Sequence, residues 1–255
     1  IVFSEPKIID SVFKEFQKDT QKFIDTAVEY LFDYEWKVFN ILVLPKAFPF
    51  GGMENPNLTF ATPTLIAGDF SLVNVIAHEL AHSWTGNLVT NSNWNNFWLN
   101  EGFTVFIERK INQIINGDSG IETRKLNSQI GYNDLLKDIK MNFPPESQST
   151  SLYPNVAKHN PDDSFSNVPY EKGYNILYYV ESIIGEDNFK LLLRTYLKKY
   201  SKQSVQFSDF QECFDEIIQK QFTPEKAKEI HDLVTWDKFI KEIGPSKLIK
   251  NDFSK

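Results

Sequence analysis

The sequence of 255 residues contains only one cysteine, Cys213. A single cysteine excludes an internal disulfide framework and is more typical of a reducing compartment. Long apolar runs are also lacking, because the richest stretch, residues 41–44, is stopped by Pro45 and Pro49. Such a run is too short to span a bilayer, and we find no signal peptide. We therefore expect no membrane insertion and a cytoplasmic protein, with the nucleus as a second compartment.

The chain has no excess of positive charge and no low-complexity tract. It carries 34 acidic and 27 basic residues, which gives a formal net charge of −7. This balance disfavours nucleic acids and anionic membranes as partners. An apolar content of 41%, with 15% aromatic residues, is ample for a packed core. We therefore expect a single domain over residues 1–255, built from two lobes.

The spacing of apolar residues predicts a small sheet near the start of the chain. Residues 9–32 have helical spacing, whereas residues 38–44 and 58–61 are typical of strands. A stretch rich in proline and glycine separates the two strands. We therefore expect a mixed α/β lobe over residues 1–95.

The remainder of the sequence predicts helices and loops. The expected helices cover residues 121–140, 171–184, 187–200 and 209–220, the last capped by Ser208 with Gln211. The loop over residues 144–169 is long enough to suggest a functional role. We expect a helical lobe over residues 96–255, and hence an α+β fold that is predominantly helical.

The most informative pattern is the run HELAH at residues 78–82, followed after eighteen residues by Glu101. Positions four apart on a helix lie on the same face, so the two imidazoles can bind one ion with Glu79 beside it. Two nitrogens and one carboxylate leave the fourth position of a zinc ion open to water, which is the catalytic arrangement. Zinc lowers the pKa of that water, and Glu79 is placed to take its proton.

The same pattern can arise by chance, and two histidines can simply be buried and hydrogen-bonded. Helix signals around both parts of the motif favour the metal site. We expect Ser71 to cap a helix that Gly86 ends, and a second helix carrying Glu101 to begin after Asn96. Both parts would then lie on rigid helices. His159 and His231 fall in no ligand pattern.

Three further runs accompany the histidine motif. In chain order the four are GGMEN at residues 51–55, HELAHSWTGNLVTN at 78–91, FWLNEGFTVFIER at 97–109 and SNVPYEKG at 166–173. Together they resemble the zinc aminopeptidases related to aminopeptidase N, and most closely the leukotriene A4 hydrolase branch. The resemblance implies a thermolysin-like zinc peptidase domain. It also implies an N-terminal β-rich domain and a C-terminal helical domain outside these 255 residues.

The resemblance implies roles for the residues that carry chemistry. His78, His82 and Glu101 would bind one zinc ion per chain, and Glu79 would be the general base. Tyr170 would donate a hydrogen bond to the oxyanion of the tetrahedral intermediate. Without the resemblance, Tyr170 could equally be an aromatic residue packed at the start of a helix.

The resemblance also implies a substrate-binding edge. Glu54 would bind the free α-ammonium group of a peptide, which would restrict cleavage to chain ends. The backbone of Gly51 and Gly52, followed by Met53, would lie against the substrate. Asp162 matches an aspartate that the leukotriene hydrolases use in opening a lipid epoxide.

Glu108 lies seven residues after Glu101 on the same helix face. It can orient a zinc-bound histidine, or it can be a solvated carboxylate paired with Arg109 or Lys110. Phe50 and Phe165 depart from the resemblance, because the leukotriene hydrolases usually carry tyrosine at both positions. Their missing hydroxyls count against the lipid reaction more than against the peptidase reaction.

The sequence therefore predicts a zinc aminopeptidase that removes N-terminal residues from peptides. The first alternative is a hydrolase of a fatty-acid epoxide that acts at the same zinc site. The second is a zinc fold that binds partners without catalysis, which the presence of Glu79, Tyr170 and Glu54 argues against. The expected partners are peptides with a free N-terminus, the flanking domains of the full-length chain and, under the first alternative, a lipid epoxide.

Overall fold

The computed structural model describes residues 1–158, 160, 162, 165–247, 249, 251 and 253. The strands are β1 (Val2–Phe3), β2 (Ile41–Val43), β3 (Gly52–Met53), β4 (Thr59–Ala61), β5 (Val89–Asn91) and β6 (Gln203–Val205). The α-helices are α1 (Ile9–Phe16), α2 (Thr20–Tyr30), α3 (Asn74–Ala81), α4 (Trp98–Ile115), α5 (Gly120–Asn142), α6 (Gly173–Ile184), α7 (Glu186–Lys199), α8 (Phe207–Gln221), α9 (Pro224–Leu233) and α10 (Trp236–Lys241). This composition confirms the α+β, predominantly helical fold.

Four strands form a mixed sheet in the order β1-β2-β4-β3. The pairs β1–β2 and β2–β4 are parallel, whereas β3 runs antiparallel to β4 with Gly52 opposite Ala61. Ile41, Val43 and Ala61 are buried, and their alternation along short strands places them on the core face of the sheet. Strand β3 is at the edge of the sheet and contacts α3. The edge strand therefore lies beside the helix that carries the histidine motif.

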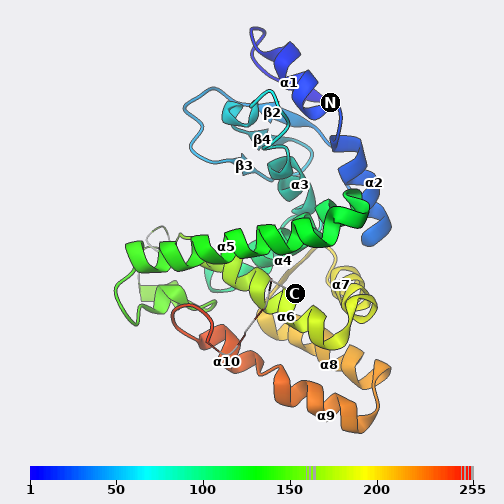
Figure 1. Ribbon diagram of the computed structural model, residues 1–255, viewed down its shortest axis with the longest axis vertical. Coiled ribbons are helices and arrows are strands. Elements are labelled where there is room, and N and C mark those ends of the chain that lie inside the picture. The colour runs from blue at the N-terminus through cyan, green and yellow to red at the C-terminus, as the bar shows by residue number, and fades with distance from the viewer. Residues whose placement is uncertain are drawn as a thin grey trace.

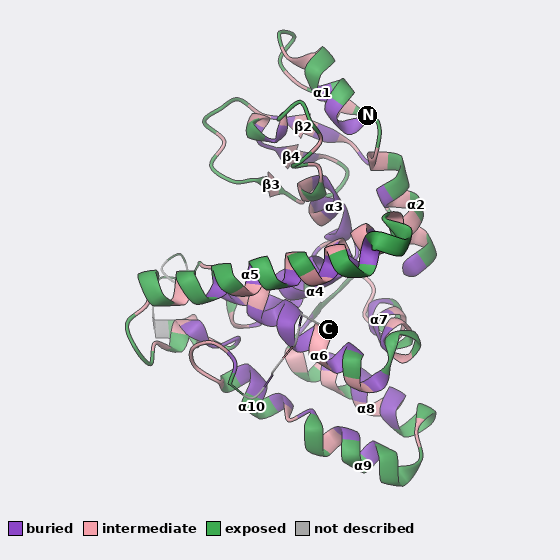
Figure 2. Ribbon diagram, in the orientation of Figure 1, coloured by how far each residue is buried: buried purple, intermediate pink, exposed green. Residues whose placement is uncertain are grey.

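Helix α4 is the centre of the molecule. It packs against α2, α3, α5 and α6, and Figure 2 shows it mostly buried, while α5 in front of it carries many exposed residues. Trp98, Phe103 and Phe106 on α4 have no exposed surface. A helix enclosed on most sides has little freedom to move. Glu101 and Glu108 are therefore presented from a rigid element.

The remaining helices follow α5. In Figure 1 the sheet, α1 and α3 lie above α4 and α5, and α6 to α10 lie below them. Helices α6 and α7 meet at Gly185, as the sequence predicts, with a φ of +85° that favours glycine. Strand β5 pairs in parallel with β6, which joins the segment after α3 to the segment before α8. None of the helices that the structure describes is long and apolar enough to cross a membrane.

Some sequence-based boundaries are wrong. Residues 9–32 form two helices, because the chain leaves the helix after Phe16 and the Thr20 hydroxyl donates to the Phe16 carbonyl. Helix α8 begins at Phe207, and the capping box is made by Gln206 and Asp209 instead of Ser208 and Gln211. Polar residues are frequent on both sides of this start, so the sequence alone does not select between caps two residues apart.

The expected ends of the histidine helix are also wrong. Helix α3 begins at Asn74, and the Ser71 amide donates to the Asp69 carboxylate in the preceding loop instead of Ser71 capping the helix. The helix ends at Ala81, and Gly86 lies further along, where its amide donates to the Val89 carbonyl. Gly86 has a φ of +138°, so it serves the turn into β5. The chain reverses direction at this turn, and glycine readily adopts the positive φ angle found there, so Gly86 is not available to end the helix.

Candidate active site

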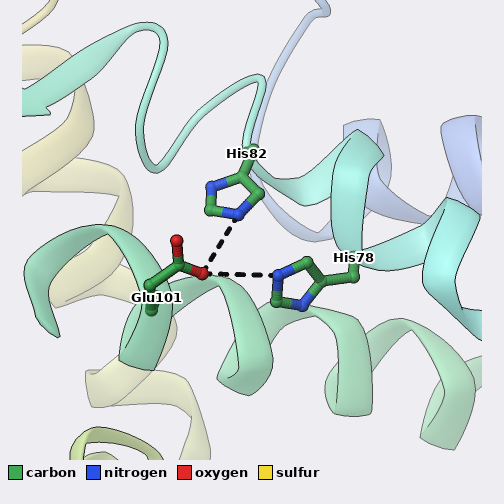
Figure 3. Close-up of side chains that lie close together, drawn as sticks. All are labelled: His78, His82 and Glu101. Atoms are coloured by element: carbon green, nitrogen blue, oxygen red, sulfur yellow. Dashed lines mark ion pairs between the residues drawn. The ribbon is translucent and has the colours of Figure 1, made fainter. Parts of the chain in front are cut away.

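His78, His82 and Glu101 converge on one point between α3 and α4. His78 lies in the last turn of α3, His82 directly follows that helix, and Glu101 lies in the first turn of α4. Figure 3 shows the two imidazoles and the carboxylate pointing toward one another. The Nε2 atoms of His78 and His82 lie 3.4 and 3.2 Å from the Oε2 atom of Glu101.

These separations fit a tetrahedral zinc ion. Ligand bonds of about 2.0–2.1 Å place neighbouring ligand atoms about 3.3–3.4 Å apart. The Glu101 Oε2 atom is buried and has no hydrogen-bond partner among the described residues. A buried oxygen of this kind is costly unless a donor or a cation faces it. The geometry and the donor set therefore suit the metal that the sequence motif predicts.

The electrostatics of the three ligands are mutually dependent. Burial lowers the pKa of His82, but the Glu101 carboxylate outweighs burial and raises this pKa to about 9. Burial raises the pKa of Glu101, but His82 and His78 outweigh burial and lower this pKa to about 2. The site therefore holds a carboxylate that attracts cations, whether protons on the imidazoles or a metal ion.

A second group of residues orients the two imidazoles. The Nδ1 atom of His78 lies 3.1 Å from the Glu108 Oε2 atom. The Nδ1 atom of His82 lies 2.8 Å from the Thr85 carbonyl oxygen and 3.0 Å from the Thr104 hydroxyl. Because each Nδ1 is engaged, each Nε2 is left to face the ligand point.

Sequence reasoning gave Glu108 this role as one of two alternatives but missed the two threonines. Thr85 contributes its backbone carbonyl, which leaves no signal in the sequence. Thr104 lies three residues after Glu101 and is fully buried, so the 3.6-residue periodicity from Glu101 could have identified it. The cations near Glu108 pair elsewhere: Arg109 with Glu171, and Lys110 with Glu181 and Glu186.

Glu79 is buried beside the ligand point, with 5% of its surface exposed. Burial, together with the carboxylates of Glu54 and Glu101, raises the pKa of Glu79 to about 7 against the lowering effect of the imidazoles. A pKa near neutrality suits a group that accepts and returns a proton. A Cβ atom at Gly52 would lie 2.3 Å from the Glu79 Oε1 atom. Gly52 therefore makes room for the Glu79 carboxylate, a role that sequence reasoning missed.

Tyr170 lines the same cleft as His78, Glu79 and Glu101. It lies in a single π-helical turn, η7 (Val168–Lys172), and its ring stacks on that of His78 with the ring centres 6.2 Å apart. Burial raises the pKa of Tyr170 well above its usual value, and the carboxylates of Glu101 and Glu54 raise it further. The phenol therefore stays protonated and can act as a hydrogen-bond donor.

A cleft of about 1260 Å³ joins these residues to the substrate-binding edge. Its lining includes His78, Glu79 and Glu101, together with Phe50, Gly51, Gly52, Met53, Glu54, Glu108, Asp162, Phe165 and Tyr170. His82 lies beneath the cleft, with 1% of its surface exposed. The long loop also lines the cleft, at positions that include Ser151, Leu152 and Val156.

The predicted substrate residues occupy different parts of this cleft. Glu54 is half-buried, and one of its carboxylate oxygens lies within 4.8 Å of one Glu79 carboxylate oxygen and of one His82 ring nitrogen. Asp162 is exposed at the cleft wall. Phe50 and Phe165 approach each other across the cleft, with their ring centres 6.5 Å apart.

Of the two remaining histidines, the structure describes only His231, which lies away from the site. His231 lies on α9, where it packs against Phe214, and its Nδ1 atom is 3.7 Å from the Asp215 carboxylate. His159 lies outside the described residues.

Comparison with known proteins gives the family. The model of the peptidase family M1 domain matches residues 14–238. Leucine aminopeptidase 2 of Saccharomyces cerevisiae is 47% identical over 244 residues, which are 95% of this chain and 35% of that protein. The chain belongs to peptidase family M1. The leukotriene A-4 hydrolase homolog of Botryotinia fuckeliana is 41% identical over 247 residues, which are 97% of this chain and 37% of that protein.

Solved structures agree with this assignment. Yeast LTA4 hydrolase in complex with bestatin matches with a TM-score of 0.91 and 44% identity, over 99% of this chain and 39% of that chain. An M1 zinc metallopeptidase of Deinococcus radiodurans matches with a TM-score of 0.66 and 18% identity, over 92% of this chain and 47% of that chain, and shares the fold. This M1 chain spans about a third of the length of the curated relatives that it matches.

Proposed function

We propose that the protein is a zinc aminopeptidase that hydrolyses the N-terminal peptide bond of its substrates, with one zinc ion per chain. The observation that carries the proposal is the convergence of His78, His82 and Glu101 beside a buried Glu79, in a cleft that also holds Glu54. Membership of family M1 supports it, as does the name of the leucine aminopeptidase to which the chain is similar.

The chain's own residues divide the work of hydrolysis. A zinc ion held by the three ligands would act as a Lewis acid and make a neighbouring water more acidic. Glu79 accepts the proton of the attacking water and returns it to the leaving amine, which its pKa of about 7 allows. Tyr170, which stays protonated, donates a hydrogen bond to the oxygen that develops negative charge.

Glu54 supplies the specificity for chain ends. Its carboxylate lies near Glu79 at the edge formed by Gly52 and Met53. A substrate ammonium paired with this carboxylate would place the first peptide bond, rather than a later one, beside Glu79. An internal peptide bond offers no cation at this position.

Hydrolysis of a lipid epoxide is the second candidate, and the structure favours it less. The names of leukotriene hydrolase relatives and the presence of Asp162 in the cleft support it. Phe50 and Phe165, whose rings face each other in the same cleft, provide no hydroxyl donor for an epoxide or a polar lipid group. A zinc fold without catalysis explains neither the pKa of Glu79 nor the position of Tyr170.

The proposal is tested on the full-length protein with a panel of aminoacyl amides, their N-acetylated counterparts and a fatty-acid epoxide. We expect turnover of the free amines. Glu79→Gln should lose about two to four orders of magnitude in kcat while keeping its zinc. Glu54→Ala should lose more with the free amines than with the acetylated substrates.

Two results would contradict the proposal. Near wild-type turnover by zinc-loaded Glu79→Gln would remove Glu79 from the mechanism. Conversion of the epoxide to a diol without any amide hydrolysis would establish the second candidate. We further propose that the protein is cytoplasmic. We also propose that domains outside residues 1–255 complete the walls of the cleft, because the relatives are longer than this chain.

A further inference from the structure

Two charged residues that the proposed mechanism does not use form an ion pair directly behind the site. The Arg109 Nη1 and Nη2 atoms donate to the two carboxylate oxygens of Glu171, at 3.0 and 2.6 Å. The side chains are only 9% and 13% exposed. Such a bidentate pair fixes the relative position and orientation of both partners.

The pair joins two elements at the positions that neighbour the site. Arg109 directly follows Glu108 on α4, and Glu171 directly follows Tyr170 in the η7 turn. Glu108 contacts His78, and Tyr170 stacks on the same imidazole. The ion pair therefore connects, behind the cleft, the two segments whose adjacent residues meet inside it.

We propose that Arg109 and Glu171 are positioning residues that hold the Tyr170 hydroxyl in register with the zinc ligands. The inference deepens the proposed function and rests on it, because it assigns the oxyanion donor Tyr170 a dedicated support. Neither residue is among those that line the cleft. Their effect on the reaction passes through the η7 turn.

The form of the η7 turn explains why it needs this support. A π-helical turn is an irregular element that seldom persists without tertiary constraints, and such turns are frequent at functional sites. On its other side the turn is fixed by Lys172, whose Nζ donates to the carbonyls of Thr150 and Gly244 at 3.0 and 2.8 Å. The turn is therefore held at two successive residues, Glu171 and Lys172, directly after Tyr170.

Glycines on the neighbouring helices leave space for the ion pair and for a close backbone contact beside it. A Cβ atom at Gly131 on α5 would lie 2.1 Å from the Glu171 Oε2 atom and 2.5 Å from an Arg109 guanidinium nitrogen. A Cβ atom at Gly102 on α4 would lie 2.8 Å from the Gly173 Cα atom. Helix α4 and the end of η7 therefore meet backbone to backbone, and α5 covers the ion pair without space for a methyl group.

Stability alone is a weak explanation for a pair of this kind. Taking two charges out of water largely cancels their attraction, so well-packed apolar residues often serve a fold equally well. In addition, the bidentate pair fixes the position of Glu171 relative to Arg109. An error of about 1 Å in the position of a reacting group can cost about a hundredfold in rate.

The test compares two buried ion pairs in the full-length, zinc-loaded protein. Glu171→Gln breaks the proposed pair. Glu181→Gln is the matched control, because Glu181 pairs with Arg124 and Lys110, each at 2.7 Å, and is 9% exposed, yet its neighbours in the chain do not line the cleft. Each variant is made alone and together with Tyr170→Phe, and kcat, KM, zinc content and Tm are measured.

We expect Glu171→Gln to lower kcat about 10- to 100-fold, with KM and zinc content nearly unchanged. In the Tyr170→Phe background, Glu171→Gln should lower kcat by less than about threefold, because the hydroxyl that Glu171 positions is already absent. Glu181→Gln should lower Tm but leave kcat within about threefold in both backgrounds. Should Glu171→Gln fail to fold, Arg109→Lys keeps the charge, loses the bidentate geometry and gives the same comparison.

Crystal structures of the variants give a readout that does not depend on activity. The Tyr170 hydroxyl should move by about 1 Å or more relative to Glu101 in Glu171→Gln and stay in place in Glu181→Gln. Equal losses of kcat in both backgrounds, or an unmoved Tyr170, would overturn the proposal. If the wild-type protein hydrolyses no aminoacyl amide, the proposed function fails, whereas the position of Tyr170 still decides the role of the pair.

Discussion

Replacing Gly52 by alanine should displace Glu79, the proposed general base, without touching the proposed metal ligands. The new Cβ atom would lie 2.3, 2.4 and 2.6 Å from the Oε1, Cδ and Cγ atoms of Glu79, whereas ordinary contacts begin at 3.4 Å. The carboxyl group or strand β3 must therefore move by about 1 Å, the difference between 3.4 and 2.3 Å. A displacement of this size costs about a hundredfold in kcat if the base moves. If the strand moves instead, overpacking costs about 1–3 kcal/mol of stability.

Gly51→Ala is the matched control. Its Cβ atom would meet only the Val75 Cγ1 atom, at 3.9 Å, which is an ordinary contact. Neither Gly51 nor Gly52 has a positive φ angle, so alanine strains the backbone at neither position. The two variants therefore differ mainly in whether the added methyl group overlaps the Glu79 side chain.

The assay is steady-state hydrolysis of an aminoacyl amide, with zinc content and Tm measured on the same preparations. We expect Gly52→Ala to retain its zinc and to lose about a hundredfold in kcat, while Gly51→Ala stays within a few-fold of wild type. A Gly52→Ala protein with wild-type kcat and wild-type Tm would refute the reasoning. It would mean that Glu79 acts without a fixed position, or that it is not the base.

The remaining predictions concern the metal. Glu108→Gln should weaken zinc binding about 10- to 100-fold, because His78 loses its orienting carboxylate, whereas Thr104→Val should cost less, since the backbone carbonyl still holds His82. Competition with a chromophoric chelator measures both, and equal affinities for Glu108→Gln and wild type would contradict the assignment. Zinc affinity should also fall as the pH is lowered from 9 toward 6, because His82, with its pKa raised to about 9, must lose a proton to bind metal. Calorimetry in buffers of different ionisation enthalpy should therefore detect proton release at pH 7, and heats that are independent of the buffer would exclude it.

The proximity of His78 and His82 could be predicted from the sequence because its geometry is local. His78 and His82 are one helical turn apart, so a helix of any exact length brings both imidazoles to one face. For this reason, the errors in the predicted ends of α3, where Ser71 and Gly86 have other roles, do not affect the predicted proximity of the two imidazoles. Glu101 is the exception, since the eighteen-residue spacing after His82 predicted its role, whereas its approach depends on how α4 crosses α3, which only the structure shows.

The roles of the glycines could not be predicted in the same way. Gly52 is close to Glu79, and Gly102 is close to Gly173, only because segments distant in sequence pack together. A sequence motif marks such positions as small, but it does not say which neighbour requires the space. The resemblance assigned Gly52 to the substrate, and the structure adds that the Glu79 carboxylate, the proposed general base, lies against Gly52.

The pairing of charges around Glu108 shows why ionic partners are hard to predict from sequence. Neighbouring helix residues project about 100° apart, because a turn contains about 3.6 residues. Glu108 therefore faces α3 and His78, while Arg109 faces η7 and Glu171, a residue 62 positions away. An acidic and a basic residue that are adjacent in a helix sequence therefore do not face each other. Because Arg109 pairs with Glu171 instead, the Glu108 carboxylate remains available to the His78 imidazole.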